Sequence, residues 1–104
     1  MTLTAYDFDG VITAGVAVKQ PCVVISGRTF AEYDDAVKYA AQFCPVYIRG
    51  SGEYGDHFHA GQFKAAMINL LGVTEFHEDH PTQIAVIREL CPDVTIVEHT
   101  ECRS

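Results

Sequence analysis

Two aspartates near the start of the chain are the first residues whose spacing suggests chemistry. Asp7 and Asp9 are separated only by Phe8 and are followed by Gly10. Two carboxylates held this close repel each other unless a cation or a shared proton lies between them. One of them can then attack an electrophile while the other moves a proton. The alternative interpretation is an aspartate-rich turn, because Asp-Gly is a common turn signal.

A second segment, Ser26-Gly27-Arg28, begins with residue types that suit an anion. The hydroxyl of Ser26 and successive backbone N–H groups can donate hydrogen bonds to phosphate oxygens. The alternative is an ordinary helix cap before Phe30. Thr29 can fill that role, which leaves Ser26 available for a ligand.

Lys64 and the pair Glu78-Asp79 complete the set of candidate residues. Lys64 is expected in the first turn of a helix, where a positive charge is mildly unfavourable, so a nearby phosphate and carboxylates would explain its position. Glu78 and Asp79 follow an apolar stretch and offer the hard oxygen ligands that Mg²⁺ prefers. The alternatives are a solvated surface lysine and an acidic cluster at the start of the helix that Pro81 opens.

Alternating apolar stretches and helical patterns would bring these residues together. They predict strands at 3–8, 22–25, 46–49, 75–77 and 94–97, and helices at 30–43, 62–71 and 81–90. This alternation indicates a single α/β domain over residues 1–104: a three-layer, Rossmann-like arrangement of a five-stranded parallel sheet with helices on both faces. Ligands of such sheets bind at the carboxyl ends of the strands, which is where Asp7, Ser26 and Glu78 fall.

With these residues in this order, the sequence resembles the haloacid dehalogenase-like (HAD) phosphohydrolase superfamily. The matching segments span most of the chain: residues 6–13 (YDFDGVIT), 25–28 (ISGR), 63–64 (FK) and 76–79 (FHED). The Phe-Lys pair at a helix start and the later Glu-Asp pair are similar to the small phosphatase branch linked to nucleic-acid end repair. The resemblance implies a minimal HAD core without a cap domain.

The resemblance also implies a mechanism and a metal. Asp7 would attack phosphorus and form an aspartyl-phosphate, and Asp9 would protonate the leaving group and then activate water. Asp7, Asp79, the backbone carbonyl of Asp9 and the neighbouring Glu78 would form the Mg²⁺ site. Phosphoryl transfer needs positioning and charge neutralisation, which a cation and a lysine supply. The expected activity is Mg²⁺-dependent hydrolysis of a phosphomonoester.

Four residues would bind the phosphoryl group of the substrate under the same resemblance. Ser26, Gly27, Arg28 and Lys64 are the expected contacts, and Ser26 and Lys64 also count as catalytic. The site differs from the end-repair-like branch at His80, where that branch often has arginine. The roles of His57, His59 and His80 stay open, although the first two are expected to line the mouth of the site.

The segments between the motifs are short. Residues 10–20 leave room for a flap-like hairpin but not for a cap domain, and residues 50–60 form a glycine-rich loop expected at the edge of the site. The site would therefore be open and could admit a phosphorylated small molecule or the phosphorylated end of a polymer. Alternatively, a second copy of the chain covers the site in a homo-oligomer.

The composition excludes several other classes of protein. With 48% hydrophobic residues, the 104-residue chain can bury a core, and no apolar run approaches the roughly 20 residues of a membrane span. A net charge of −7 argues against binding of long nucleic acid, because proteins that bind it usually present a basic face. The chain does not start with a basic segment and an apolar stretch, so we expect a cytoplasmic protein.

The cysteines and histidines have less specific patterns. We expect free thiols, in the core for Cys22, Cys44 and Cys91 and in an exposed tail for Cys102. A structural zinc site would draw four ligands from these residue types, with candidates at His57, His59, His77, His80, His99 and Cys102.

A non-enzymatic alternative also remains. Fold does not determine function, so a catalytically inactive HAD-fold protein could bind a metal or a partner without turnover. Such a protein would have no reason to retain Asp9, because only its backbone would contact the metal. This favours the enzyme.

Overall fold

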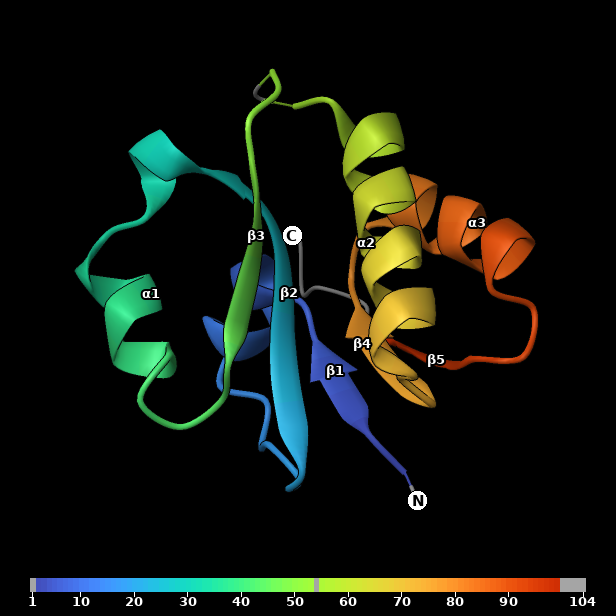
Figure 1. Cartoon of the computed structure of the whole chain (residues 1–104), viewed down its shortest axis with the longest axis horizontal. Coiled ribbons are helices and arrows are strands. Elements are labelled where there is room, and N and C mark those ends of the chain that lie inside the picture. The colour runs from blue at the N-terminus through green and yellow to red at the C-terminus, as the bar shows by residue number, and fades with distance from the viewer. Residues whose placement is uncertain (1, 54, 100–104) are drawn as a thin grey trace.

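The computed structural model describes residues 2–53 and 55–99. Its strands form one five-stranded sheet in the order β3-β2-β1-β4-β5, and every neighbouring pair is parallel (Figure 1). The strands are β1 (Thr4–Tyr6), β2 (Cys22–Thr29), β3 (Val46–Gly50), β4 (Glu75–Glu78) and β5 (Thr95–Glu98). The predicted α/β fold with a five-stranded parallel sheet is confirmed.

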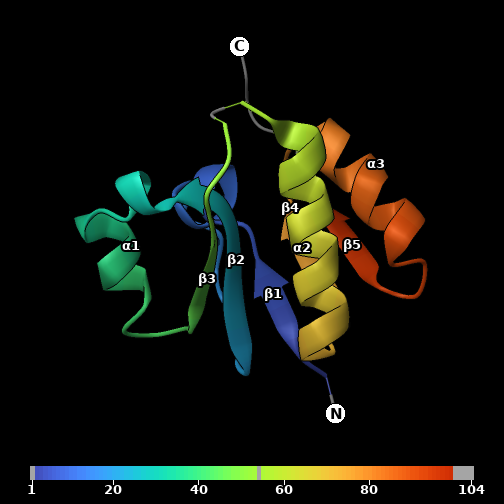
Figure 2. The ribbon, with the colours of Figure 1, turned by 45° about the horizontal axis from the view of Figure 1, so that its top comes forward.

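Helical segments connect these strands. α1 (Asp35–Ala40) lies between β2 and β3, α2 (His57–Leu71) between β3 and β4, and α3 (Pro81–Leu90) between β4 and β5. Two short turns, η1 (Phe8–Ile12) and η2 (Phe30–Glu32), follow β1 and β2. Figure 2 shows α2 and α3 side by side, with the sheet between them and α1.

Two apolar clusters lie on opposite faces of the sheet. The first packs α2 and α3 against the strands and includes Ala5 and Ile25. The second includes Tyr6, Val24 and Val37, the last of which comes from α1. Because successive side chains of a strand point to opposite faces, Ala5 and Tyr6 enter different clusters. Helices therefore cover both faces, as predicted.

The register of the central strands brings their carboxyl ends to one edge. Tyr6, the last residue of β1, pairs with Val24 of β2 and with His77 of β4. The backbone N–H of Asp7 then donates to the carbonyl of His77 (2.9 Å). Asp7 and Glu78, which directly follow this pair, are thereby brought to the same edge of the sheet.

Residues 10–20 form no β-hairpin, which corrects the prediction of a flap-like hairpin there. η1 ends at Ile12, and a turn and an irregular stretch lead to β2. The N–H groups of Ile12 and Thr13 donate to the carbonyls of Asp7 and Phe8 (3.3 and 3.1 Å), and the side chain of Val11 is buried in the core. These local hydrogen bonds and the buried valine fold the segment back onto the sheet.

The helix predicted over residues 30–43 is much shorter in the structure. Phe30 opens the separate turn η2, and α1 starts after Asp34, whose carboxylate accepts the N–H of Val37 (3.2 Å). Phe30 and Phe43 are 76% and 60% exposed, while Val37 is fully buried. An aspartate cap inside the apolar pattern therefore starts a new helix, because its side chain satisfies a backbone donor there.

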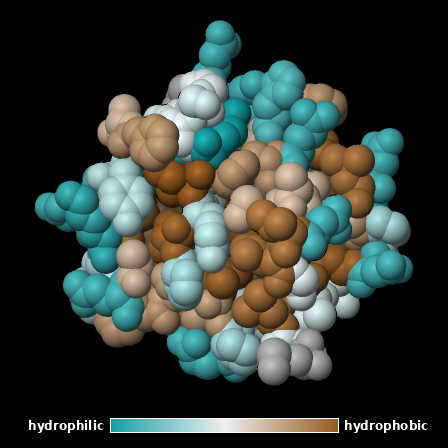
Figure 3. All heavy atoms as spheres, in the orientation of Figure 1, coloured by the Kyte–Doolittle hydropathy of each residue, from teal (hydrophilic) through white to brown (hydrophobic). Residues whose placement is uncertain are grey.

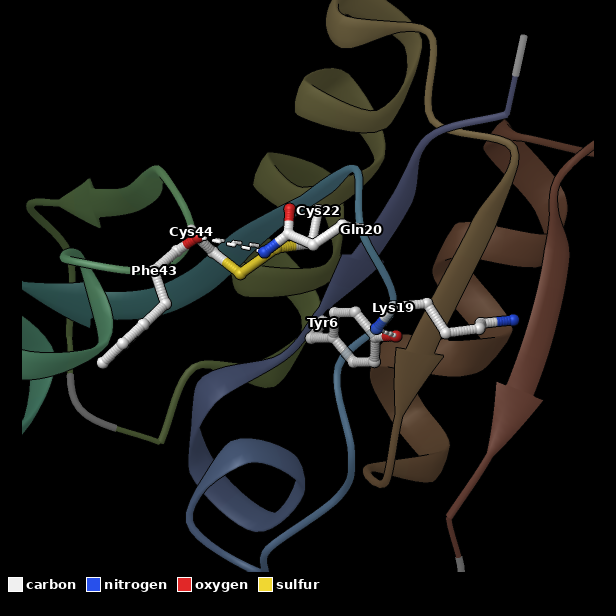
Figure 4. The surroundings of a disulfide bond; sticks show 6 residues. All are labelled: Tyr6, Lys19, Gln20, Cys22, Phe43 and Cys44. Carbon is white, nitrogen blue, oxygen red and sulfur yellow. Dashed lines mark hydrogen bonds between the residues drawn. A yellow bond between two sulfur atoms is a disulfide. The ribbon is translucent and has the colours of Figure 1, made fainter.

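Cys22 and Cys44 form a disulfide, which corrects the prediction of free thiols (Figure 4). Cys22 opens β2 and Cys44 precedes β3, and the pairing of these strands brings their Cα atoms to 5.6 Å. Cys91 is a buried free thiol that donates to the carbonyl of Ala65 (3.3 Å), and Cys102 lies outside the described residues. Since disulfides persist mainly in oxidising compartments, the cysteines do not support the cytoplasmic location, which stays a prediction.

Several large hydrophobic side chains lie on the surface. Figure 3 shows a hydrophobic area over the C-terminal half of α2, the helix in which Leu70 is 77% exposed.

Within residues 2–53 and 55–99, no helix has the length and apolar character needed to cross a membrane.

Candidate active site

A cavity of about 440 Å³ opens at the carboxyl edge of the sheet. The predicted site residues that line it come from segments far apart in the sequence: Asp7, Asp9, Gly27, Arg28, Lys64 and Asp79. The other predicted residues, Ser26 and Glu78, are completely buried behind this lining. Asp56 and Ala60 on the lining belong to the segment 50–60 expected at the edge of the site, whereas Gly10, Glu32, Arg49 and Gln83 were not predicted there.

Lys64 lies between two carboxylates in the wall of this cavity. Its Nζ donates to Oδ1 of Asp7 (2.8 Å) and to Oε2 of Glu78 (2.7 Å). The side chains of Lys64, Asp7 and Glu78 are only 2%, 7% and 0% exposed. Buried charges are tolerated when they are paired and hydrogen-bonded, so these contacts explain how a lysine can sit in the core.

One cation does not neutralise two buried carboxylates. Burial raises the pKa of the Asp7 carboxyl well above its ordinary value, although Lys64 opposes this shift. Burial also acts against ionised Glu78, but the Lys64 ammonium lowers the pKa of Glu78 below its ordinary value. For Lys64, burial favours the neutral amine, but the two carboxylates outweigh it and raise the pKa of Lys64. A proton or a further cation is therefore needed to balance the charge of Asp7.

α2 begins at His57 instead of the predicted Gln62, so Lys64 is not in its first turn. The carboxylate of Asp56 caps the helix by accepting the N–H of His59 (3.1 Å). The glycine-rich loop predicted at 50–60 accordingly ends at Asp56. Asp56 is a residue type that commonly caps a helix, so the sequence contained a signal for this start. The glycines before Asp56 favoured the interpretation of the segment as a loop.

Small residues let α2 approach its neighbours and carry Lys64 inward. A Cβ atom on Gly27 of β2 would lie 3.1 Å from Cβ of Ala60, and one on Gly61 would lie 3.0 Å from the side chain of Val86 in α3. Both distances are tighter than most packed Cβ contacts. The glycines therefore permit the close packing that brings Lys64 to the strand ends.

Glu78 anchors Lys64 from behind the cavity wall. Its Oε2 accepts from Lys64, and its Oε1 accepts the backbone N–H groups of Asp79 (3.0 Å) and His80 (3.3 Å). Both oxygens thus have hydrogen-bond donors from the protein itself. Of the predicted acidic pair, Asp79 is the residue on the cavity lining.

Ser26 lies inside the strand rather than at its end. β2 continues to Thr29, beyond the predicted end at Ile25, so Ser26 is an internal strand residue. Its hydroxyl oxygen accepts the backbone N–H of Arg28 (3.1 Å), and the residue is fully buried. At this position Gly27 and Arg28, and not the Ser26 hydroxyl, line the cavity.

Arg28 also lies between two carboxylates, at the rim of the cavity. Its Nε and Nη2 donate to the two oxygens of Asp9 (3.0 and 2.8 Å), and its Nη1 donates to Asp34 and to the carbonyl of Glu32 (both 2.9 Å). The guanidinium lies 4.8 Å from the ring centroid of Phe8. The hydrogen bonds with Asp9 raise the pKa of Arg28. The pairing of Arg28 with Asp9 had no signal in the sequence.

Two stacked histidines form another part of the lining. The rings of His57 and His80 are nearly parallel, with centroids 3.6 Å apart, and Gln83 Nε2 lies 2.9 Å from Nδ1 of His57. His57 therefore borders the cavity as expected. His59 does not line it and instead contacts the carboxylate of Asp56 (2.6 Å).

Asp7, Glu78 and Asp79 could together hold a metal ion. Each offers one ligand oxygen within 4.8 Å of the others, and no other such group of three is found in the part of the chain that the structure describes. Carboxylate oxygens suit Mg²⁺, and the uncompensated charge at Asp7 favours a cation at this place. The donor set therefore fits Mg²⁺. The histidines do not enter this group, so the zinc interpretation gains no support from the described residues.

Comparison of the chain with protein families, with curated proteins and with solved structures found no match. The evidence on function therefore consists of the residues and their geometry. It includes the parallel sheet, the cavity at its carboxyl edge and the charged clusters around that cavity.

Proposed function

We propose that this protein is a Mg²⁺-dependent phosphomonoester hydrolase that works through an aspartyl-phosphate on Asp7. The convergence of Asp7, Lys64 and Asp79 on one cavity carries the proposal, because it joins a nucleophile, a fixed cation and a metal ligand. The parallel sheet with helices on both faces supports the resemblance to a minimal, uncapped, three-layer HAD core.

Asp7 is well placed to act as the nucleophile. Lys64 donates to its Oδ1, and we assign the attack on phosphorus to Oδ2. As the Oδ2–P bond forms, the bond from phosphorus to the ester oxygen breaks and that oxygen takes a proton. Asp9, on the same cavity, would supply this proton and later accept one from the water that hydrolyses the acyl phosphate.

The predicted phosphoryl contacts divide into two groups. Gly27, Arg28 and Lys64 line the cavity, where Lys64 would offset negative charge on the phosphoryl oxygens. Ser26 lies behind the lining and would support the backbone of Arg28, whose N–H it accepts.

The metal would be held by Asp7 and Asp79, with Glu78 close behind and with the backbone carbonyl of Asp9 that the resemblance adds. When bound, Mg²⁺ supplies positive charge beside the phosphoryl oxygens. Asp79 lines the cavity and has no other role in the proposed chemistry. We therefore expect Asp79 to act mainly through metal affinity.

The substrate class is a phosphorylated small molecule or the phosphorylated end of a polymer. The ammonium of Lys64 on the cavity lining suits an anionic group. A net charge of −7 disfavours a long nucleic acid, whose binding depends on many phosphate contacts. A second copy of the chain could cover the site in a homo-oligomer.

A catalytically inactive protein that binds a metal or a partner is the alternative function. It is favoured by the contacts of Asp9, because both of its carboxylate oxygens already accept from Arg28. Metal binding by the parent protein without hydrolysis of any phosphate ester would support this alternative.

Hydrolysis of p-nitrophenyl phosphate tests the proposal. We expect activity that needs Mg²⁺ and disappears with a chelator, and Asp7→Asn should lower kcat by at least about 10³-fold. Asp35→Asn is the matched control, because Asp35 is exposed at the start of α1 and outside the cavity lining. It should keep the parent rate. Parent-like turnover by Asp7→Asn would reject Asp7 as the nucleophile.

The metal role of Asp79 is tested by titrating Mg²⁺ against activity. Asp79→Asn should need a higher Mg²⁺ concentration for half-maximal activity and regain much of the parent rate at saturation. A defect that no Mg²⁺ concentration changes would show that Asp79 acts in another way.

A further inference from the structure

The guanidinium of Arg28 holds Asp9, the residue to which the proposed function gives both proton transfers. Nε donates to Oδ2 of Asp9 (3.0 Å) and Nη2 donates to Oδ1 (2.8 Å). Two parallel hydrogen bonds between a guanidinium and a carboxylate set their relative orientation. On the basis of the proposed function, we propose that Arg28 is a positioning residue that holds Asp9 in place for proton transfer, and not a ligand of the substrate phosphate.

The other side of the guanidinium is anchored to the segment after β2. Nη1 donates to Oδ2 of Asp34 and to the carbonyl of Glu32, both at 2.9 Å. Asp34 is itself tied to α1, because its Oδ1 accepts the N–H of Val37 (3.2 Å). The ring of Phe8, which lies between the two aspartates of the first motif, faces the guanidinium at 4.8 Å. Arg28 therefore connects the first motif to the start of α1.

The number of N–H groups limits what else Arg28 can bind. A guanidinium has five N–H donors, and Arg28 makes four hydrogen bonds, to Asp9, Asp34 and Glu32. Two-pronged binding of a phosphate needs two parallel donors, and only one N–H of Nη2 is left, so Arg28 would have to release either Asp9 or one of its Nη1 partners to bind a phosphate in that way. Arg49, which lines the same cavity, donates to the carbonyls of Gly27 and Glu53 instead.

A positioning role predicts a loss of activity that depends on the leaving group. p-Nitrophenolate leaves readily without a proton, whereas an alkoxide must be protonated as its bond to phosphorus breaks. The value of kcat/KM reports the steps up to transfer of the phosphoryl group to Asp7, so the later attack of water does not enter it. A misplaced Asp9 should therefore reduce kcat/KM for an alkyl phosphate far more than for p-nitrophenyl phosphate.

The test compares Arg28→Lys with the parent protein on p-nitrophenyl phosphate and glycerol 2-phosphate at saturating Mg²⁺. Lysine keeps the charge and removes the fork of donors. We expect kcat/KM for glycerol 2-phosphate to fall about 10- to 100-fold, as part of the contribution of general acid catalysis. For p-nitrophenyl phosphate, kcat/KM should stay within about threefold of the parent, and so should the affinity for inorganic phosphate measured by calorimetry.

Arg49→Lys is the matched control for this experiment. The side chains of Arg49 and Arg28 are 11% and 17% exposed in the same cavity, but Arg49 donates to backbone carbonyls. Its substitution should leave the ratio of the two kcat/KM values unchanged. Asp34→Asn should shift that ratio in the same direction as Arg28→Lys by a smaller factor, and it provides the readout if Arg28→Lys does not fold.

Two outcomes would overturn the positioning role of Arg28. One is an equal loss of kcat/KM on both esters, and the other is a loss of phosphate affinity of about tenfold or more, as expected for a phosphate ligand. A parent protein that hydrolyses neither ester with Mg²⁺ would instead reject the proposed function, and the role of Arg28 with it. The parent rates and the variant ratio thus separate the two failures.

Discussion

A cation between two carboxylates occurs twice around the cavity, once in the core and once at the rim. The buried cluster consists of Lys64, Asp7 and Glu78, and the rim cluster consists of Arg28, Asp9 and Asp34. Their difference is exposure to solvent. The carboxylates of the buried cluster are 7% and 0% exposed, and those of the rim cluster are 58% and 56% exposed.

This difference in exposure changes how strongly the three charges of each cluster interact and what shifts their pKa values. In the buried cluster, desolvation is the largest influence on each pKa, and the charges interact strongly because little water screens them. In the rim cluster, hydrogen bonds have the largest influence, and solvent weakens the charge interactions. The buried cluster can therefore tune reactivity, while the rim cluster can mainly set orientation.

Removal of each cation should produce the largest difference between the two clusters. Lys64→Met leaves two buried carboxylates without a positive charge between them, so we expect the free energy of unfolding to fall by about 3–5 kcal/mol. Arg28→Met acts on carboxylates that water can solvate and should lower it by about 1 kcal/mol or less. Urea denaturation of both variants measures this. Equal losses would show that burial does not distinguish the clusters.

The two carboxylates of the buried cluster should respond differently to neutral replacements. Glu78→Gln replaces one of the two carboxylate oxygens, which accept from Lys64 and from two backbone N–H groups, with an amide NH2 that cannot accept. It should lower the free energy of unfolding by about 1–3 kcal/mol. Asp7→Asn replaces a carboxylate whose ionisation burial disfavours, so it should be neutral or stabilising. Denaturation in the presence of a chelator tests this order, and the reverse order would contradict the charge balance described above.

The smallest expected effect is an opposite dependence of stability on pH. The Val37 N–H and then Arg28 lower the pKa of Asp34, so its contribution is present above the unfolded value of about 3.9 and is lost as the pH falls through its folded value. Burial raises the pKa of Asp7, so its contribution is present below about 3.9 and is lost as the pH rises through its folded value.

Two variants measured across this range check the signs. Relative to the parent, the free energy of unfolding of Asp7→Asn should increase as the pH rises above about 4, and that of Asp34→Asn should decrease as the pH rises towards about 4. Changes of the same sign in both variants would mean that the two clusters do not differ in this way.

The parts of the fold that follow from local patterns were predictable. The helix at Pro81–Leu90 was predicted with its observed bounds, because Pro81 suits a first turn and apolar residues follow at helical spacing. The cores of all five strands were also located from apolar runs. The longer helix at 30–43 was wrong, because the cap at Asp34 outweighs the apolar spacing around it.

Most residues of the candidate site were predicted correctly, but the position of some of them relative to the cavity was not. Asp7, Asp79 and Lys64 meet at one cavity, as expected from residues at the carboxyl ends of strands and on the following helix. Ser26 was expected at the cavity and is buried, because β2 extends past it. The length of a strand beyond its apolar core depends on pairing with its neighbours, which a single sequence does not display.

The amino-acid sequence by itself determined the order of strands and helices and the chemical types that follow each strand, because apolar periodicity acts over a few residues. Only the tertiary structure decided which carboxylate faces which cation and how much water reaches them. Lys64 and Asp7 are 57 residues apart in the chain, and Arg28 and Asp9 are 19 apart. Such partners are selected by strand register and helix packing, so the same charges produce a buried cluster in one place and a solvated cluster in the other.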